Sequence, residues 1–206
     1  ATNQVINAEN LGTLKSLPDK SFQLIYIDPP FNTGRKQVRT NRTSTESKTG
    51  NLGFQGKRYE QVVNTVLSYD DEFADYWAFL EPRLIEAHRL LKQTGTLYLH
   101  LDYREAHYAK VLLDALLEES AFKRNHLAYD YGGKSKSRWP AKHDTILVYV
   151  KDPDNYYFNS EEVDREPYMA PGLVTKEKVE KGKLPTDVWW HTIVSPTGKE
   201  KTGYPT

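Results

Sequence analysis

The residues best suited to chemistry form one short string, Asp28-Pro29-Pro30-Phe31, directly after the apolar run at 22–27. Each proline fixes its own φ, lacks an N–H and pushes the preceding residue into an extended conformation, so the turn is stiff. The Asp28 carboxylate and the Pro29 carbonyl are then two acceptors just past the end of a strand. Two acceptors suit one NH2 group, and the Phe31 ring offers a flat face. The string therefore has the parts to hold a planar ring that carries an amine.

Strands and helices alternate along the chain around this string. Apolar patterning predicts strands at 22–27, 96–101 and 145–151, with shorter ones at 5–6 and 125–129, and helices at 11–17, 69–92 and 104–119. Pro82 is expected to kink or divide the second helix. The alternation predicts an α/β fold with a mostly parallel sheet and helices on both faces. Ligands of such sheets lie at the carboxyl ends of strands, where Asp28 stands.

Two stretches interrupt the alternation. Residues 32–68 are rich in Gly, Thr, Asn and Lys, which predicts a mobile basic loop with a short helix at 60–67. Residues 152–186 are polar and punctuated by proline, which predicts a small insertion outside the sheet or a target-recognition segment. We therefore divide the chain into a catalytic α/β region at 1–151, this insertion, and a C-terminal stretch at 187–206.

Composition limits the function classes. The 206 residues carry 28 basic and 28 acidic side chains, so any surface that attracts nucleic acid must be a local patch. The absence of cysteine excludes a disulfide framework, a thiolate metal site and a cysteine nucleophile. The chain has no apolar run of membrane length and no leader ahead of Val5, which predicts a soluble cytoplasmic protein without a membrane partner.

Basic residues gather in two runs that follow predicted strands. Lysines and arginines there would neutralise phosphates, and flat rings would stack on unstacked bases, although each run alone is also compatible with a solvated loop. The predicted DNA-binding residues are Arg35, Lys36, Arg39, Lys134, Lys136, Arg138 and Trp139.

The histidines do not predict a metal site. His100 and His107 are separated by Asp102 without a compact ligand spacing, so we expect no bound metal. His143-Asp144 precedes a predicted strand, and we expect it to be structural.

The string INAENLGTLKSLPDKSFQLIYIDPPFN resembles the opening of the permuted, β-class DNA amino methyltransferases. The resemblance continues through YWAFLEPRLIEAHRLLKQTGTLYLHLD and HDTILVYVKDPDNYYFN, and LPTDVWWHTIV and TGYPT resemble the segment that leads into the family's cofactor loop. It implies a Rossmann-like methyltransferase sheet and methyl transfer from S-adenosylmethionine to N6 of an adenine flipped out of double-stranded DNA. The implied location is the bacterial cytoplasm, on DNA, with a homodimer or a cognate restriction nuclease as candidate partners.

The resemblance also assigns roles to residues. It implies that Asp28, Pro29, Pro30 and Phe31 are catalytic, and the aromatic ring after the prolines favours adenine. Ala8-Glu9 stands where many relatives have Gly-Asp, which implies that Ala8, Glu9 and Asp28 approach the cofactor, although Glu9 is equally compatible with a surface acid. Methylation of cytosine at carbon 5 is excluded, because it needs a cysteine nucleophile.

The sequence departs from the family pattern after residue 206. The family's glycine-rich cofactor segment follows the lead-in at 187–206 and is not present, so we expect a sheet and a cofactor site that are incomplete at the C-terminus. Three alternatives stay open: methylation of cytosine N4, methylation of a glutamine amide, which the basic loops disfavour, and a catalytically silent DNA-binding relative.

Overall fold

The computed structural model describes residues 3–52, 58–69, 71–117, 121–123, 128–129, 137, 139 and 143–191. The chain divides into two compact units. The sheet unit comprises Ala1–Phe31 and Asp75–Ile193, and the hairpin unit comprises Asn32–Ala74 and Val194–Thr206.

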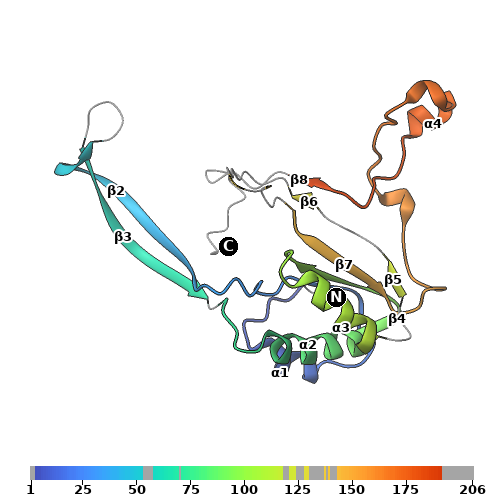
Figure 1. Ribbon diagram of the computed structural model, residues 1–206, viewed down its shortest axis with the longest axis horizontal. Coiled ribbons are helices and arrows are strands. Elements are labelled where there is room, and N and C mark those ends of the chain that lie inside the picture. The colour runs from blue at the N-terminus through green and yellow to red at the C-terminus, as the bar shows by residue number, and fades with distance from the viewer. Residues whose placement is uncertain are drawn as a thin grey trace. The chain divides into compact units, whose positions relative to one another are not determined.

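A four-stranded sheet organises the sheet unit, in the order β1-β4-β7-β5 (Figure 1). Its strands are β1 (Phe22–Ile27), β4 (Leu91–Leu101), β7 (Thr145–Val150) and β5 (Ala121–Lys123). β1 pairs with β4 in parallel, whereas β7 is antiparallel to both β4 and β5. The fold is α/β as predicted, but the expected mostly parallel sheet is wrong for the described strands. A crossover helix separates β1 from β4, and parallel pairing requires such a connection.

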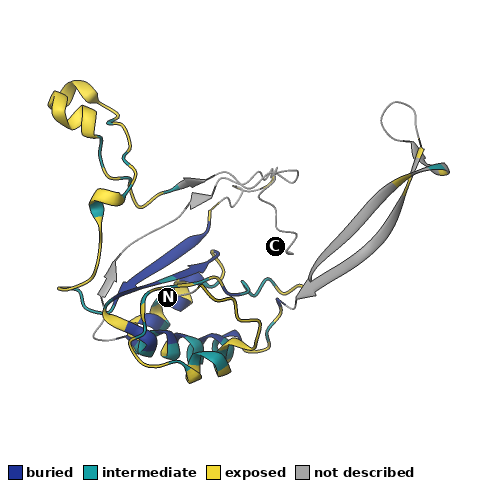
Figure 2. Cartoon of the chain, turned by 180° about the vertical axis from the view of Figure 1, so that it is seen from behind, coloured by how far each residue is buried: buried dark blue, intermediate teal, exposed yellow. Residues whose placement is uncertain are grey.

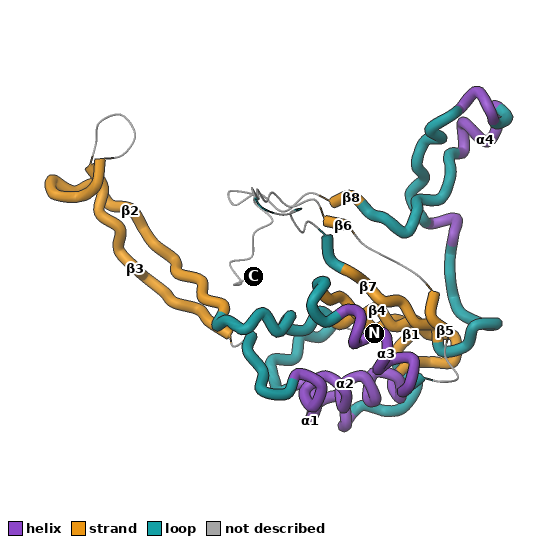
Figure 3. Tube along the Cα trace, viewed as in Figure 1, coloured by secondary structure: helices purple, strands orange, loops and turns teal. Residues whose placement is uncertain are grey.

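Three helices accompany the sheet: α1 (Asn10–Ser16), α2 (Tyr76–Leu90) and α3 (Ala106–Leu116) (Figure 3). α2 packs on β4, α3 packs on β7, and the two helices also contact each other, so they cover the same face. Among the described residues, the opposite face is covered by Trp189, which packs with Tyr98 against Ile146 and Val148. Helices on both faces are therefore not seen in the described part of the chain.

Burial explains the strand sequences. Every residue of β7 is buried, which fits its uninterrupted apolar run and its dark blue colour in Figure 2. In β1, residues alternate between exposed and half-buried, and Phe22, Leu24 and Tyr26 are the exposed ones. β1 is thus an outer strand of the described sheet.

Helix α2 begins later than the predicted 69–92, at Tyr76, because the Asp75 side chain caps it by accepting from the Ala78 N–H at 2.9 Å. The helix runs through Pro82 to Leu90, so Pro82 does not divide it, and the alternative of a kink stays a prediction. Proline removes one backbone hydrogen bond, and the buried face of Leu80, Leu84 and Ala87 holds the helix together around that loss.

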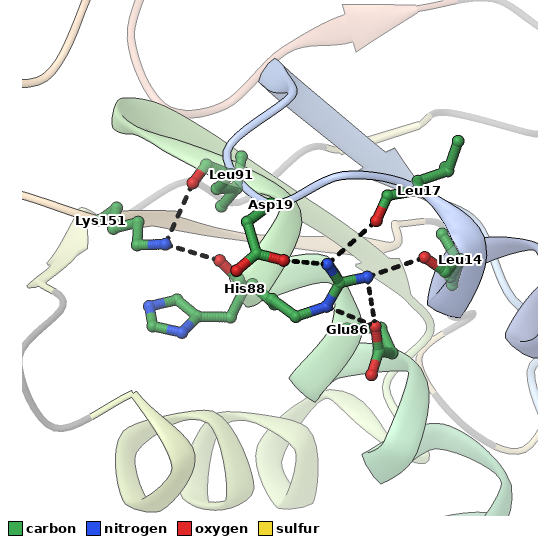
Figure 4. A network of polar contacts seen from close by, with 8 residues as sticks. Leu14, Leu17, Asp19, Glu86, His88, Leu91 and Lys151 are labelled. Atoms are coloured by element: carbon green, nitrogen blue, oxygen red, sulfur yellow. Dashed lines mark hydrogen bonds and ion pairs between the residues drawn. The ribbon is translucent and has the colours of Figure 1, made fainter.

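Two partly buried cations fix the C-terminal end of α2 (Figure 4). Arg89 donates to the carbonyls of Leu14 and Leu17 at 2.9 and 3.0 Å and pairs with Glu86 and Asp19. Lys151 donates to the carbonyls of His88 and Leu91 at 2.8 and 3.0 Å. Both cations satisfy carbonyls at or near helix ends, which ties α1, α2 and β7 together.

The hairpin unit corrects the prediction for 32–68. Instead of a loop with a helix at 60–67, β2 (Gln37–Leu52) and β3 (Arg58–Tyr69) form an antiparallel pair. Val62, Val63 and Val66 are β-branched, and such side chains lose χ1 freedom in a helix but fit a strand. Their density is the signal that the prediction missed.

The remaining predictions have mixed outcomes. The strands at 22–27 and 96–101 are confirmed, as are the helices at 11–17 and 104–119 and the strand at 145–151, each within a few residues. The strand at 5–6 is wrong, since these residues have no regular structure and Val5 is fully exposed. Of 125–129, only β6 (Ala128–Tyr129) is described, and it pairs with β8 (Trp190–His191).

The insertion at 152–186 contributes no strand to the sheets. It contains η2 (Ser160–Glu162), η3 (Pro171–Leu173) and α4 (Lys176–Lys181), and one bridge joins Glu166 to Lys183. No helix within the described ranges is long and apolar enough to cross a membrane.

Candidate active site

The parallel pairing of β1 and β4 brings their ends together. Ile27 pairs with Leu99, so the next residues, Asp28 and His100, stand side by side at the carboxyl ends of both strands. Alternation puts the two side chains on the face opposite α2 and α3, because Leu97 and Leu99 belong to the buried core while Tyr98 packs on the Trp189 side. This is the edge at which α/β sheets bind ligands.

The turn after β1 has a fixed backbone and an exposed carboxylate. The Tyr76 hydroxyl, on the first residue of α2, donates to the Pro30 carbonyl at 2.9 Å. Pro29 is buried, whereas the Asp28 side chain is 58% exposed. The two prolines and the tyrosine therefore fix the backbone, and the carboxylate points where a ligand can reach it.

His100 contacts most of the polar and aromatic groups at this strand end. Its Nδ1 lies 2.9 Å from the Tyr26 hydroxyl and 3.5 Å from Asp28 Oδ1. Its Nε2 lies 3.5 Å from Asp144 Oδ2, just before β7. The Phe31 ring meets the imidazole edge to face at 5.4 Å between centroids. His100 is only 8% exposed, so it forms the wall of the site rather than its opening.

The electrostatics of the site act on Asp28. Partial burial raises the pKa of the Asp28 carboxyl above its ordinary value; His100 opposes this shift and the nearby Asp144 carboxylate adds to it. The pKa of Asp102, at the end of β4, is also raised by burial, and Arg104 opposes the shift. The charged form of Asp28 is therefore destabilised in this site, and a positive charge that develops nearby would stabilise it.

In the hairpin unit, Asp71 holds the loop that follows Phe31. Asp71 is 1% exposed and accepts from the Asn32 N–H at 2.7 Å and from the Thr33 hydroxyl. The Gly34 N–H donates to the Asp71 carbonyl at 3.0 Å, and Gly34 has a positive φ of 69°, which glycine adopts without strain. Asn32 also has a positive φ, and its side-chain oxygen accepts from the Phe73 N–H at 3.3 Å.

The predicted cofactor residues have different surroundings. Glu9 caps α1, accepting from the N–H groups of Leu11 and Gly12 at 3.0 and 2.8 Å, and it pairs with Arg83 at 2.7 Å. These contacts, led by the two backbone bonds, lower the pKa of its carboxyl. Ala8 is exposed beside it. Both oxygens of Glu9 are thus already used for helix capping, whereas Asp28 remains open to a ligand.

The predicted DNA-binding residues are only partly described. Arg35 and Lys36 are exposed, and Trp139 is 95% exposed. Arg39 lies in β2, while Lys134, Lys136 and Arg138 lie outside the described residues. Their role on DNA stays a prediction.

Sequence reasoning missed three residues that the structure brings to the site: Tyr26, His100 and Asp144. The signal was available in the strand register. Because Ile27 pairs with Leu99 in the parallel register, the residues that follow them, Asp28 and His100, lie side by side near the carboxyl ends of the two strands.

Comparison with known proteins identifies the family of the chain. The model of the DNA methylase family matches residues 22–206, so the chain belongs to the DNA methylase family. It is 30% identical to the type II methyltransferase M.KpnI of Klebsiella pneumoniae, over 70% of this chain and 31% of that protein. It is 24% identical to the Mod subunit of the type III restriction-modification enzyme EcoP15I of Escherichia coli, over 73% of this chain and 24% of the subunit.

A further relative is the DNA adenine methyltransferase YhdJ of Escherichia coli strain K12, which is 26% identical over 77% of this chain and 45% of that protein. The chain thus spans between about a quarter and a half of these relatives' lengths.

Proposed function

We propose that this protein transfers a methyl group from S-adenosylmethionine to N6 of an adenine flipped out of double-stranded DNA. Membership of the DNA methylase family and the similarity to an adenine methyltransferase support the proposal. The observation that carries it is the exposed Asp28 carboxylate beside the Phe31 ring, on a turn that prolines and Tyr76 hold rigid.

Asp28 and the Pro29 carbonyl accept the two hydrogens of the adenine amine. The lone pair of the amine nitrogen is delocalised into the adenine ring, so the planar amine is a poor nucleophile. Two hydrogen bonds favour pyramidal nitrogen and stabilise the positive charge that develops as the methyl group arrives. Asp28 acts by alignment and electrostatics, and it need not be a strong base because the amine becomes acidic once it is alkylated.

Phe31 receives the flipped base. Flipping the base out of the duplex costs a few kcal/mol of lost stacking and pairing. Stacking of the base on the Phe31 ring offsets part of that cost. The T-shaped contact with His100 keeps the ring in place for this purpose.

The cofactor site fits the described residues in part. S-adenosylmethionine, when bound, supplies an electrophilic methyl group on a sulfonium. Asp28 is open to it, but the oxygens of Glu9 are committed to the α1 cap and to Arg83. We therefore assign Ala8-Glu9 a supporting role, holding α1 in place, and keep direct cofactor contact as a prediction for Asp28.

The DNA partner follows from the same proposal. Arg35, Lys36 and Arg39, together with Lys134, Lys136, Arg138 and Trp139, are proposed to contact phosphates and unstacked bases. A restriction nuclease is a candidate partner, since one relative is the Mod subunit of a restriction-modification enzyme.

Labelled S-adenosylmethionine and duplex DNA test the proposal directly. After incubation with the protein, the DNA is digested to nucleosides, and label in N6-methyladenine is the expected result. Label in N4-methylcytosine would show that the acceptor is cytosine and not adenine. DNA binding without label would indicate a silent relative.

A further inference from the structure

We propose that His100 is a positioning residue of this site, holding the Asp28 carboxylate and the Phe31 ring in one fixed geometry. The inference rests on the proposed function and adds a residue that neither touches the base nor belongs to the proline turn. Its basis is that one buried imidazole lies against both groups that the proposed mechanism uses.

The turn alone does not fix these side chains. Prolines restrict φ and the Tyr76 hydrogen bond holds the Pro30 carbonyl, but the Asp28 side chain is 58% exposed and has free rotation about its own bonds. His100 supplies what is missing: its Nδ1 is 3.5 Å from Asp28 Oδ1, and its ring abuts Phe31 at 5.4 Å.

His100, in β4, is itself held by two residues. The Tyr26 hydroxyl lies 2.9 Å from Nδ1, and the Tyr26 ring also meets the imidazole edge to face. Asp144 Oδ2, from the residue before β7, lies 3.5 Å from Nε2. Contacts from β1 and from the start of β7 therefore meet at this one side chain of β4, which gives it the support that a positioning residue needs.

Among the described residues, two carboxylates lie within 4 Å of the imidazole nitrogens: Asp28, directly after β1, and Asp144, directly before β7. Asp102, directly after β4, pairs with Arg104 at 2.5 Å. Asp28 and Asp144 face opposite nitrogens of the ring. His100 thus lies between two carboxylates whose mutual repulsion contributes to the raised pKa of Asp28.

Rate measurements test the positioning role. A small misplacement of a reacting group costs on the order of 100-fold in rate. We expect His100→Ala to lower the single-turnover methylation rate by about 10- to 100-fold, with DNA and S-adenosylmethionine affinities within about threefold of wild type. His100→Gln, which keeps a polar group of similar reach, should recover part of the rate.

His107→Ala is the matched control, because His107 is an exposed histidine on α3 and should leave the rate unchanged. Circular dichroism establishes that each variant is folded. An unchanged rate in His100→Ala, or an equal loss in DNA affinity and rate, would overturn the inference.

A second readout does not depend on activity. The carboxyl 13C shift of Asp28, followed against pH, reports the pKa of that group in each variant. His100 lowers this pKa and Asp144 raises it, so His100→Gln should move it upward and Asp144→Asn should move it downward. If neither variant moves the Asp28 titration, the inference fails.

The two readouts separate the inference from the proposed function. Opposite titration shifts in a protein that transfers no methyl group would uphold the Asp28–His100 contact and remove the assigned reaction. Methyl transfer by the wild type that His100→Ala leaves unchanged would uphold the assigned reaction and remove the positioning role of His100.

Discussion

At the residue scale, the proposed reaction depends on one carboxylate. Asp28 stands in the open at the end of β1, and its pKa is raised by partial burial and by Asp144. The sequence made this residue prominent because the double proline is rare and its effect on the backbone is strong. His100 and Asp144 were not recognisable in the same way, since an isolated histidine in a strand and an acid before a strand carry no local signal. Their role depends on which strands pair.

Replacing Asp28 tests its electrostatic role. Asp28→Asn keeps the shape and removes the charge, so we expect the single-turnover rate to fall by about 100- to 1,000-fold, as when one preorganised group is lost. The DNA dissociation constant should stay within about threefold of wild type, because the contact acts mostly in the transition state. Glu72→Gln, at an exposed acid, serves as control. Parallel losses of binding and rate would contradict the assignment.

The raised pKa of Asp28 also predicts a stability effect. A carboxyl whose folded pKa is raised disfavours folding when it is charged, so Asp28→Asn should raise the melting temperature at neutral pH. Below the unfolded-state pKa both states are protonated, and the difference should shrink toward zero. Thermal unfolding followed between acid and neutral pH measures this, and a melting temperature that falls in the variant at neutral pH would contradict it.

At the scale of elements, local patterns predicted most of the sheet unit. The strand at 22–27 and the helix at 104–119 follow directly from their periodicity, and both were confirmed. The β2–β3 hairpin was not predicted, because the glycines and polar residues of this stretch are typical of a loop. The β-branched residues at 62–66 favour a strand and are the signal that indicates it. The sheet's mixed direction also could not be predicted, because the pairing of β7 depends on contacts between distant parts of the chain.

Arg89 joins α1 to α2, and its loss should weaken both. Arg89→Ala leaves the carbonyls of Leu14 and Leu17 and two carboxylates without this donor. We therefore expect a lower free energy of unfolding, with the loss limited by the partial exposure of the side chain. Arg89→Lys should lose less, since it keeps the charge but not the fork of donors. Urea titration measures both, and equal stability of all three proteins would contradict the role.

Asp71 should protect the backbone of the loop that it holds. In Asp71→Ala the Asn32 N–H loses its acceptor, and one net hydrogen bond of about 1 kcal/mol corresponds to roughly fivefold to tenfold faster amide exchange. The Gly34 N–H bonds to the Asp71 carbonyl of the main chain and is the internal control. Hydrogen exchange resolved to single amides compares the two, and equal acceleration of both would indicate general loosening instead.

At the scale of the whole molecule, the equal numbers of acids and bases mean that the proposed DNA binding would depend on where the cations lie. Arg35 and Lys36 are exposed close after the proline turn in sequence.

The salt dependence of DNA binding tests this placement. Each phosphate contact contributes about 0.9 to the slope of log affinity against log salt. Replacing Arg35 and Lys36 by glutamine should therefore reduce the slope by about 2 and weaken binding to all sequences alike. Replacing the exposed Lys15 and Lys92 removes the same charge elsewhere and should leave the slope unchanged. Equal effects of the two pairs would assign the result to net charge alone.

The bond from Tyr76 to the Pro30 carbonyl has a consequence for how the protein responds to heat. Tyr76 is the first residue of its helix, and helix ends fray well before the middle melts. We therefore expect warming to loosen the proline corner before the fold is lost, so that the proposed methyl transfer stops at a temperature below the midpoint of global denaturation.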